Sequence, residues 1–266
     1  MPMVVGCRSP RLSCRALYGF IHRSDEKSLD RSIRRPLRLV LTCEHADHRI
    51  PRAYASLFSG ANDVVRSHRG WDPGALPLAR LLARRLGEPV FVTRWSRLLV
   101  EANRSPTNPS IWSRYTKALP APVRERILAR YWRPHRQAVE AAVAEWLVRG
   151  ERVVHVAVHS FTPELEGVVR NADVGLLFDS RRRHESAFAR RWAARLRAHD
   201  PALRVRYNYP YLGLADGLAT ALRRRHPASS YLGFELEVNQ ARSTAPDWRR
   251  LGGVLATSLS EVLDRA

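Results

Sequence analysis

Short apolar runs alternate with longer stretches of helical periodicity along the chain from Leu37 onward. Runs of a few residues predict buried strands, and apolar side chains that recur every three to four residues predict helices. The expected strands are Leu37–Cys43, Val90–Thr93, Leu98–Ala102, Val153–Val158, Asp173–Phe178, Leu203–Tyr207 and Leu232–Val238. The expected helices are Pro73–Leu86, Pro122–Arg149 with a kink at Pro134, His184–Ala198 and Asp247–Asp264. This alternation is typical of an α/β fold with a mostly parallel sheet, and we expect a single domain over residues 37–266.

Residues 1–36 do not follow this pattern. They are basic, contain two cysteines, and have no acidic residue before Asp25. Their composition faintly resembles a transit peptide, but the apolar core of a secretory signal is missing. We interpret them as a basic extension that is disordered or precedes the true start codon, and we exclude them from the expected domain.

The composition narrows the class of protein. Hydrophobic residues make up 45% and charged residues 26%, which is typical of a globular chain and not of a disordered one. No apolar run approaches the roughly 18 residues that a membrane span requires. The three cysteines, Cys7, Cys14 and Cys43, lack CxxC spacing, which argues against a disulfide framework or a thiolate zinc site. We therefore expect a soluble cytoplasmic protein.

The formal net charge of +20 would ordinarily suggest a polyanionic partner. However, Lys27 and Lys117 are the only lysines among the 45 basic residues, and the arginines are scattered along the chain. So uneven a ratio is typical of GC-rich coding. A nucleic-acid-associated protein stays an alternative hypothesis, and attraction of an acidic substrate is a weaker inference from the same charge.

Side chains suited to catalysis follow several expected strands. In an open α/β sheet, ligands bind beyond the carboxyl ends of the strands. Glu235 and Glu237 share one face of the last strand, because side chains alternate along a strand. The residues that follow the other strands are Glu44, His45, His48, Asn103, Arg104 and His159. Their convergence at one edge predicts a functional site there.

Two histidines, a carboxylate and a further glutamate are the composition of a catalytic zinc site. The metal would lower the pKa of a water molecule, and the glutamate would take its proton. An arginine would hold a substrate carboxylate through two parallel hydrogen bonds. The sequence contains no GxSxG, P-loop or GxGxxG motif, which disfavours the corresponding enzyme classes. Simpler roles remain open for single residues, such as Asp72 as the N-cap of the helix after Pro73.

Seven segments in order carry a resemblance to a known family. They are CEHADHRIP (43–51), HRGWDPGALPLA (68–79), SRLLVEANRSP (96–106), HSFTPE (159–164), VRNADVGLLF (169–178), NYPYLG (208–213) and LEVNQ (236–240). Together they resemble the N-formylglutamate amidohydrolase family over about residues 37–245. The resemblance implies a three-layer α/β sandwich with a mostly parallel mixed sheet, like that of zinc exopeptidases and carboxypeptidases. Known members hydrolyse the formyl amide of N-formyl-L-glutamate to formate and glutamate.

The resemblance also implies roles for individual residues. It implies His45, Asp72 and His159 as ligands of zinc or another divalent metal, with Glu44 and His48 as alternatives to Asp72. Glu237 would be the general base, with Glu235 as its rival. The resemblance further implies Asn103 and Arg104 as substrate-carboxylate ligands, and Arg170 as a group that polarises the carbonyl or binds the second carboxylate. Tyr211 lies on a segment that would cover the substrate.

The sequences of the HRGWD and LEVNQ segments differ from those of the family's histidine-pathway enzymes. We therefore expect this chain to share the family's hydrolytic chemistry more closely than its substrate. The expected substrate is a small acidic N-acyl amino acid, either N-formyl-glutamate or a relative. A member that binds a metabolite without catalysis is the other alternative.

Overall fold

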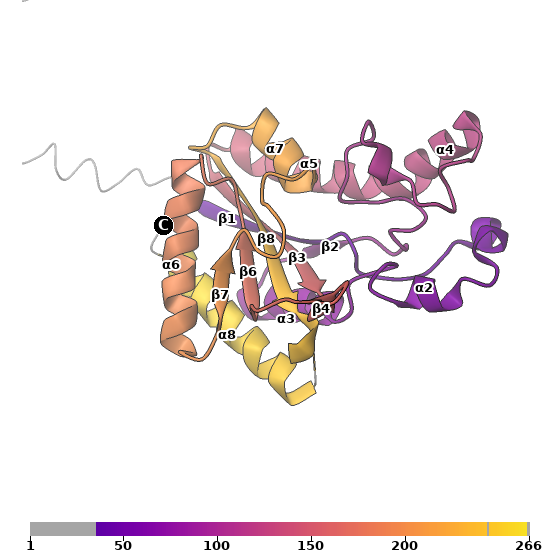
Figure 1. Cartoon of the computed structure of the whole chain (residues 1–266). Helices are drawn as coiled ribbons and strands as arrows, with labels where there is room; N and C mark the ends of the chain where they lie inside the picture. Colours follow the sequence, from indigo (N-terminus) through magenta and orange to yellow (C-terminus); the bar gives the residue numbers. More distant parts are fainter. Residues whose placement is uncertain (1–35, 244, 265–266) are drawn as a thin grey trace, which may run out of the picture. The chain divides into compact units, whose positions relative to one another are not determined.

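The computed structural model of the chain describes residues 36–243 and 245–264. The predicted basic extension therefore lies, apart from Pro36, outside the described residues. Strands and helices alternate through the described part (Figure 1). The strands are β1 (Leu37–Cys43), β2 (Val90–Val92), β3 (Arg152–Phe161), β4 (Glu164–Leu165), β5 (Val168–Val169), β6 (Val174–Leu177), β7 (Val205–Tyr207) and β8 (Tyr231–Asn239). The α-helices are α2 (Asn62–Arg66), α3 (Ala75–Leu86), α4 (Ala121–Ile127), α5 (Arg133–Val148), α6 (Arg183–His199), α7 (Leu218–Arg225) and α8 (Ala245–Leu263).

Six strands form one mixed sheet in the order β2-β1-β3-β8-β6-β7. Strands β2, β1, β3 and β8 run parallel to one another, whereas β6 runs antiparallel to β8 and parallel to β7. The carboxyl ends of β1, β3 and β8 therefore meet at one edge of the sheet. The short strands β4 and β5 form a separate antiparallel hairpin.

Helices cover both faces of the sheet (Figure 1). Helices α3, α6 and α8 pack together on one face, and α5 and α7 pack on the other. The strands between them are apolar on both sides, because neither face meets water. Buried side chains of the first interface include Leu41, Leu78, Val156, Trp192 and Phe234. This arrangement confirms the predicted α/β sandwich with a mostly parallel mixed sheet.

A second apolar cluster lies outside the sheet and holds the irregular segments between β1 and α5. It is centred on Phe58, Leu99, Ile111, Ile127 and Trp132. Short turns of 3₁₀-helix, η1 (Arg52–Phe58) and η2 (Pro109–Ile111), belong to these segments. A third such turn, η4 (Gln240–Arg242), follows β8. The cluster gives the long connections of this region a fixed framework, which matters because they contribute residues to the site.

Three sequence expectations need correction. The predicted strand Leu98–Ala102 is wrong, because these residues form turns that pack Leu99 into the second apolar cluster. The predicted helix over 122–149 is two α-helices joined by a π-helical turn, η3 (Leu128–Trp132), directly before Pro134. That interruption accommodates the proline, which has no N–H to donate. Strand β3 continues to Phe161, so His159 lies within the strand and not after it.

None of the helices in the described ranges combines the length and the apolar character needed to cross a membrane.

Candidate active site

Three chemically active side chains come from the adjoining ends of the central strands. His45 lies two residues after β1, His159 is the third-last residue of β3, and Glu237 is the third-last residue of β8. In the parallel pairing of β3 and β8, His159 is the register partner of Glu237. All three residues are at least 96% buried. Backbone pairing therefore fixes the mutual position of His159 and Glu237.

Asp72 joins this group from the connection that precedes α3. Its backbone N–H donates to the carbonyl of His45 at 3.0 Å, which ties the two segments together. The prediction that Asp72 caps the helix is wrong. Gly74 occupies the cap position in the left-handed conformation, and no side chain caps the helix. The Asp72 carboxylate instead turns inward, with Oδ2 at 3.2 Å from Nδ1 of His45 and 2.9 Å from Nδ1 of His159.

The geometry of these three residues fits a metal ion. One ligand atom from each of His45, Asp72 and His159 lies within 4.8 Å of the other two. Ligands about 2.0–2.1 Å from a tetrahedral zinc ion are separated by roughly 3.3 Å, close to the spacings described above. The alternatives fit less well. The Glu44 carboxylate lies on the Nε2 side of His159, at 3.3 Å, and His48 packs against the Trp71 ring.

A buried carboxylate faces the outer nitrogen of each histidine. Nε2 of His45 hydrogen-bonds Glu101, and Nε2 of His159 approaches Glu44. Metal-binding histidines commonly donate their second N–H to such a carboxylate, which orients the ring. Burial opposes protonation of His159, but hydrogen bonds to Asp72 and Glu44 raise its pKa well above the usual value. The negative charges of these carboxylates would also stabilise a bound cation.

The two glutamates of β8 have different surroundings. Glu237 is 4% exposed, and its Oε2 has no hydrogen-bond partner among the described residues. Burial, opposed by His159 and reinforced by the charges of Asp72 and Glu235, raises the pKa of Glu237 to about 8. Glu235 is only half-buried, and its Oε1 accepts a hydrogen bond from the Asn103 amide at 3.1 Å. Glu237 is thus the glutamate whose carboxylate is free to exchange a proton with a reactant.

The residues expected to bind substrate lie in different settings. Arg104 lines the cavity, but its Nη1 donates to the carbonyl oxygens of Asn103 and Asp216. The Asn103 side chain is largely engaged by the protein, because its Oδ1 accepts from the N–H of Leu218 at 2.8 Å. Tyr211 also lines the cavity.

Arg170 does not line the cavity but stands behind Tyr211. Its Nη1 donates to the Tyr211 hydroxyl at 3.1 Å, and its guanidinium lies over the Tyr211 ring at 5.1 Å. It contacts Thr162 as well, at 3.4 Å. Arg170 can therefore influence the site through Tyr211 and Thr162.

Arg97 and Glu101 are site residues that the sequence interpretation missed. The Arg97 guanidinium pairs with Glu101 at 2.5 Å and with Asp72 at 3.4 Å, and it lines the cavity. Burial opposes ionisation of Glu101, but Arg97 and His45 lower its pKa. Both residues lie in the SRLLVEANR segment. The apolar run in this segment predicted a strand, and that interpretation gave neither residue a role in the site. The separation of four residues between Arg97 and Glu101 was the available sequence signal for an ion pair between them.

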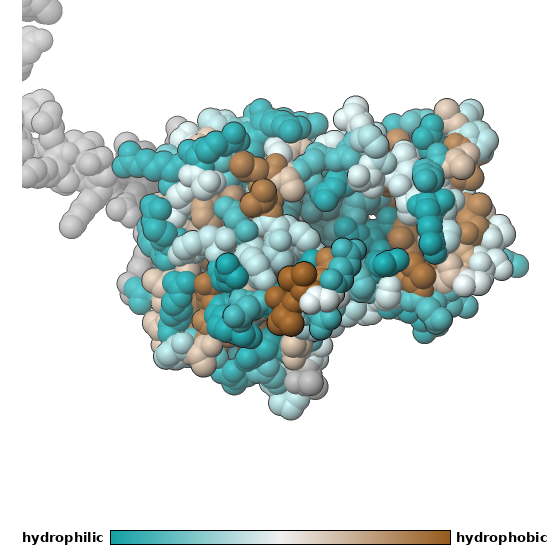
Figure 2. Space-filling model, in the orientation of Figure 1, coloured by the Kyte–Doolittle hydropathy of each residue, from teal (hydrophilic) through white to brown (hydrophobic). Residues whose placement is uncertain are grey.

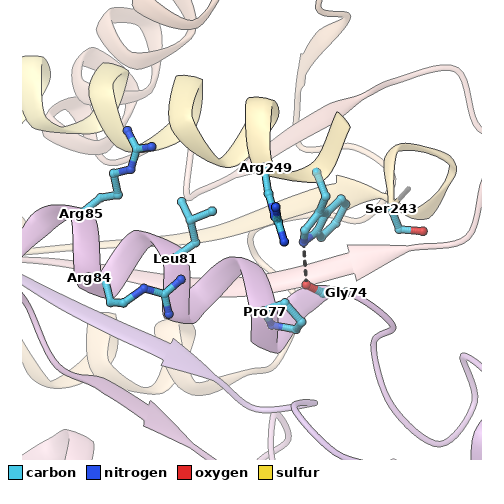
Figure 3. A pocket seen from close by; sticks show the side chains of 8 residues that line it. Gly74, Pro77, Leu81, Arg84, Arg85, Ser243 and Arg249 are labelled. Carbon is cyan, nitrogen blue, oxygen red and sulfur yellow. Dashed lines mark hydrogen bonds between the residues drawn. The ribbon is translucent and has the colours of Figure 1, made fainter. Parts of the chain in front are cut away.

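The site residues enclose a cavity of about 530 Å³. Its walls also include the half-buried His68, the polar side chains of Ser160 and Gln240, and several apolar residues. A second cavity, of about 620 Å³, lies between α3 and α8 (Figure 3). It is lined by Leu81, Trp248 and three arginines, and by no histidine or carboxylate, so it offers no acid–base chemistry. Trp248 Nε1 donates to the Gly74 carbonyl at 3.1 Å and so steadies the turn that carries Asp72.

Buried acid–base groups in a polar cavity at the carboxyl ends of parallel strands are typical of an enzyme active site in an α/β fold. The sequence comparison is more specific. Residues 37–242 match the family described as N-formylglutamate amidohydrolase. The chain therefore belongs to the N-formylglutamate amidohydrolase family, and it is a hydrolase that acts on amide C–N bonds. No curated protein sequence matches it.

Solved structures resemble the chain over most of its length. The gene product Atu2144 from Agrobacterium tumefaciens is 30% identical, with a TM-score of 0.74 over 85% of this chain and 90% of that one. An N-formylglutamate amidohydrolase from Ralstonia eutropha JMP134 is 18% identical, with a TM-score of 0.62 over 85% of this chain and 94% of that one. A metallo-carboxypeptidase from Burkholderia cenocepacia is more distant, at 13% identity and a TM-score of 0.39, which is too low to inform the site.

Proposed function

We propose that the chain is a metal-dependent amidohydrolase that cleaves the amide bond of N-formyl-glutamate or a related N-acyl amino acid. One observation carries the proposal. The Nδ1 atoms of two buried histidines converge on the Asp72 carboxylate, and the unpartnered carboxylate of Glu237 lies on the neighbouring strand. His45, Asp72 and His159 would hold the metal. A bound divalent ion would polarise the scissile carbonyl and lower the pKa of water.

The protein's own groups supply the remaining chemistry. Glu237 takes a proton from the attacking water, whose oxygen bonds to the carbonyl carbon. Glu237 then returns that proton to the amide nitrogen as the C–N bond breaks, which releases a carboxylic acid and a free amino acid. Burial raises the pKa of Glu237, which favours its holding the proton until it passes to the amide nitrogen. Arg104 would hold the carboxylate of the substrate.

Metal binding is tested on the full chain by elemental analysis after loading with zinc and dialysis. We expect about one zinc ion per chain, and loss of most of it in Asp72→Ala. The matched control is His48→Asn, which removes a nearby histidine that lies outside the cluster and should leave the zinc content unchanged. Equal zinc content in all three proteins would refute the assigned ligand set.

The role of Glu237 is tested by comparing Glu237→Gln with Glu235→Gln. Both variants remove one carboxylate from the same strand face, so they differ in position and not in chemistry. We expect Glu237→Gln to keep its metal and lose at least about 100-fold in kcat, since general acid–base catalysis contributes 10²–10⁴. The reverse pattern would move the base role to Glu235.

Hydrolysis is followed as formate release from N-formyl-glutamate, with and without added zinc. Formate release that depends on the metal supports both parts of the proposal. A metal-loaded protein that cleaves no N-acyl amino acid would instead indicate the non-catalytic alternative.

A further inference from the structure

One part of the catalytic cavity wall is apolar. It consists of Phe161 at the end of β3, Leu165 of β4, and Leu212 and Ala215 from the connection between β7 and α7. The Leu212 side chain is 66% exposed although it borders a cavity. Contact with a ligand removes the surface of such a side chain from water, and this burial stabilises the bound ligand.

Exposed apolar residues cluster in two segments that also contribute to the cavity or adjoin its wall, and two of these residues, Tyr211 and Leu212, line the cavity itself. Seven large apolar residues are exposed in the described part of the chain, and six of them belong to the β5 strand or to the segment 207–214. These six are Val168, Val169, Tyr207, Tyr211, Leu212 and Leu214. The contact of Arg170 with Tyr211 joins the two segments. Figure 2 shows an apolar patch over the hairpin of β4 and β5. Such clustering marks a binding surface more than scattered single residues do.

The two arginines that line the cavity differ in their partners. Arg97 and Arg104 are the arginines that line it, and Arg97 is already paired with Asp72 and Glu101. Arg104 forms no ion pair with any described residue; its Nη1 donates to the carbonyl oxygens of Asn103 and Asp216, and its other N–H groups can bind one carboxylate. Burial and the neighbouring arginines lower the pKa of His68, which disfavours a positive charge on this residue.

A second substrate carboxylate would meet an unfavourable charge. Glu235 lines the cavity and has no cationic partner among residues 36–243 and 245–264. Its one hydrogen bond from another side chain comes from the neutral amide of Asn103. Two carboxylates brought together without a cation between them repel each other.

From the apolar wall and the one cavity-lining arginine without an ion pair among the described residues, we infer that this enzyme acts on N-acyl amino acids with one carboxylate and an apolar group. That group packs against Leu165 and Leu212. The inference rests on the proposed function and narrows its substrate class from acidic amino acids to apolar ones. The apolar group has two sources, the side chain of the amino acid or the acyl chain, and the substrates chosen for the test distinguish them.

The test measures release of the free amino acid by the zinc-loaded full chain from four compounds. N-formyl-leucine carries the apolar group on the amino acid, and N-hexanoyl-glycine carries it on the acyl side. N-formyl-glycine has neither, and N-formyl-glutamate replaces it with a carboxylate. We expect kcat/KM for one of the two apolar compounds to exceed that for N-formyl-glycine by at least about tenfold, and to exceed that for N-formyl-glutamate as well.

Leu212→Ser tests the contact itself. The expected result is a fall of about fivefold in the ratio of kcat/KM between the preferred apolar compound and N-formyl-glycine. Val148→Ser is the matched control. It makes the same kind of change at an 88% exposed apolar residue, which is the last residue of α5 and lies outside the cavity wall, so this ratio should stay constant.

The outcomes separate this inference from the proposed function. A preference for N-formyl-glutamate overturns the inference and supports the function. An unchanged ratio in Leu212→Ser, with a shift to smaller species in light scattering, identifies the patch as a contact between copies and also overturns it. If no compound is cleaved, the proposed function fails. Calorimetry on Glu237→Gln then decides the inference, which requires tighter binding of an apolar compound than of N-formyl-glutamate.

Discussion

His155 links the stability of the fold to pH. Its side chain is fully buried in the middle of β3, where Nε2 lies 2.9 Å from the Thr42 hydroxyl and Nδ1 lies 2.8 Å from the Tyr231 hydroxyl. A neutral imidazole has one donor and one acceptor, and hydroxyl groups can complement either. The neutral ring is therefore fully hydrogen-bonded, and burial lowers the pKa of His155 to about 4.

The size and sign of the effect follow from linkage. In the unfolded chain the pKa of a histidine is about 6.5, so between pH 6.5 and about 4 the unfolded chain binds a proton that the folded protein does not. Above that range His155 has no influence on the pH dependence. Within it, the free energy of unfolding falls by about 1.4 kcal/mol per pH unit as the pH decreases. Between pH 7 and pH 5 the loss due to His155 is about 2 kcal/mol.

The assay compares the wild-type chain with His155→Gln by urea unfolding at pH 7 and pH 5. Glutamine keeps a donor and an acceptor but does not titrate, and all other ionisable groups are common to both proteins. We expect the difference in unfolding free energy to shrink by about 2 kcal/mol at the lower pH. Val143→Ala, which truncates a buried residue of α5 that carries no proton, should give the same difference at both pH values. An equally constant difference for His155→Gln would refute the reasoning.

Three further predictions concern the framework of the site. Gly175→Ala would place a Cβ 1.9 Å from the Tyr209 carbonyl oxygen, so we expect a loss of about 1–3 kcal/mol in unfolding free energy and lower activity. Arg223→Met removes the guanidinium 3.0 Å from the buried carboxylate of Glu185, which then keeps Arg182, at 3.4 Å, as a cationic partner. It should cost about 3–5 kcal/mol in denaturant unfolding, and adding Glu185→Gln should recover part of that loss. Burial raises the pKa of the Cys43 thiol, so peptide mapping should find it unmodified by iodoacetamide in the native protein and alkylated after unfolding.

Local pattern was sufficient to predict the elements that build the sheet. The apolar run 37–43 coincides with β1, and the stop at Gly87 coincides with the end of α3, where that glycine adopts the left-handed conformation. The strand predicted for residues 98–102 was wrong, because an apolar sequence of strand length can also form a turn whose side chains pack into a separate cluster. Which of these occurs depends on distant partners such as Ile111 and Ile127, and a local pattern does not contain that information.

The site was partly predictable for a similar reason. His45, His159 and Glu237 lie at or near the ends of strands, where the topology of an α/β sheet brings residues together. The inward turn of Asp72 depends on its backbone contact with His45, and the sequence of the DPG turn equally suited a helix cap. The pairing of Arg97 with Asp72 joins two connections 25 residues apart, and no periodicity reveals such a contact.

The register of β3 and β8 has a consequence for how this enzyme can diversify. His159 and Glu237 are held opposite each other by a continuous ladder of main-chain hydrogen bonds, whereas the apolar wall, apart from Phe161 at the end of β3, belongs to the β4–β5 hairpin and to the connection after β7. Insertions or replacements in those two segments would alter which compound fits and leave the reactive atoms in place. Conversely, a shift of one residue in β8 would turn Leu236 or Val238 toward the reaction and carry Glu237 to the opposite face. If the proposed roles hold, selectivity and chemistry occupy largely separable parts of the chain.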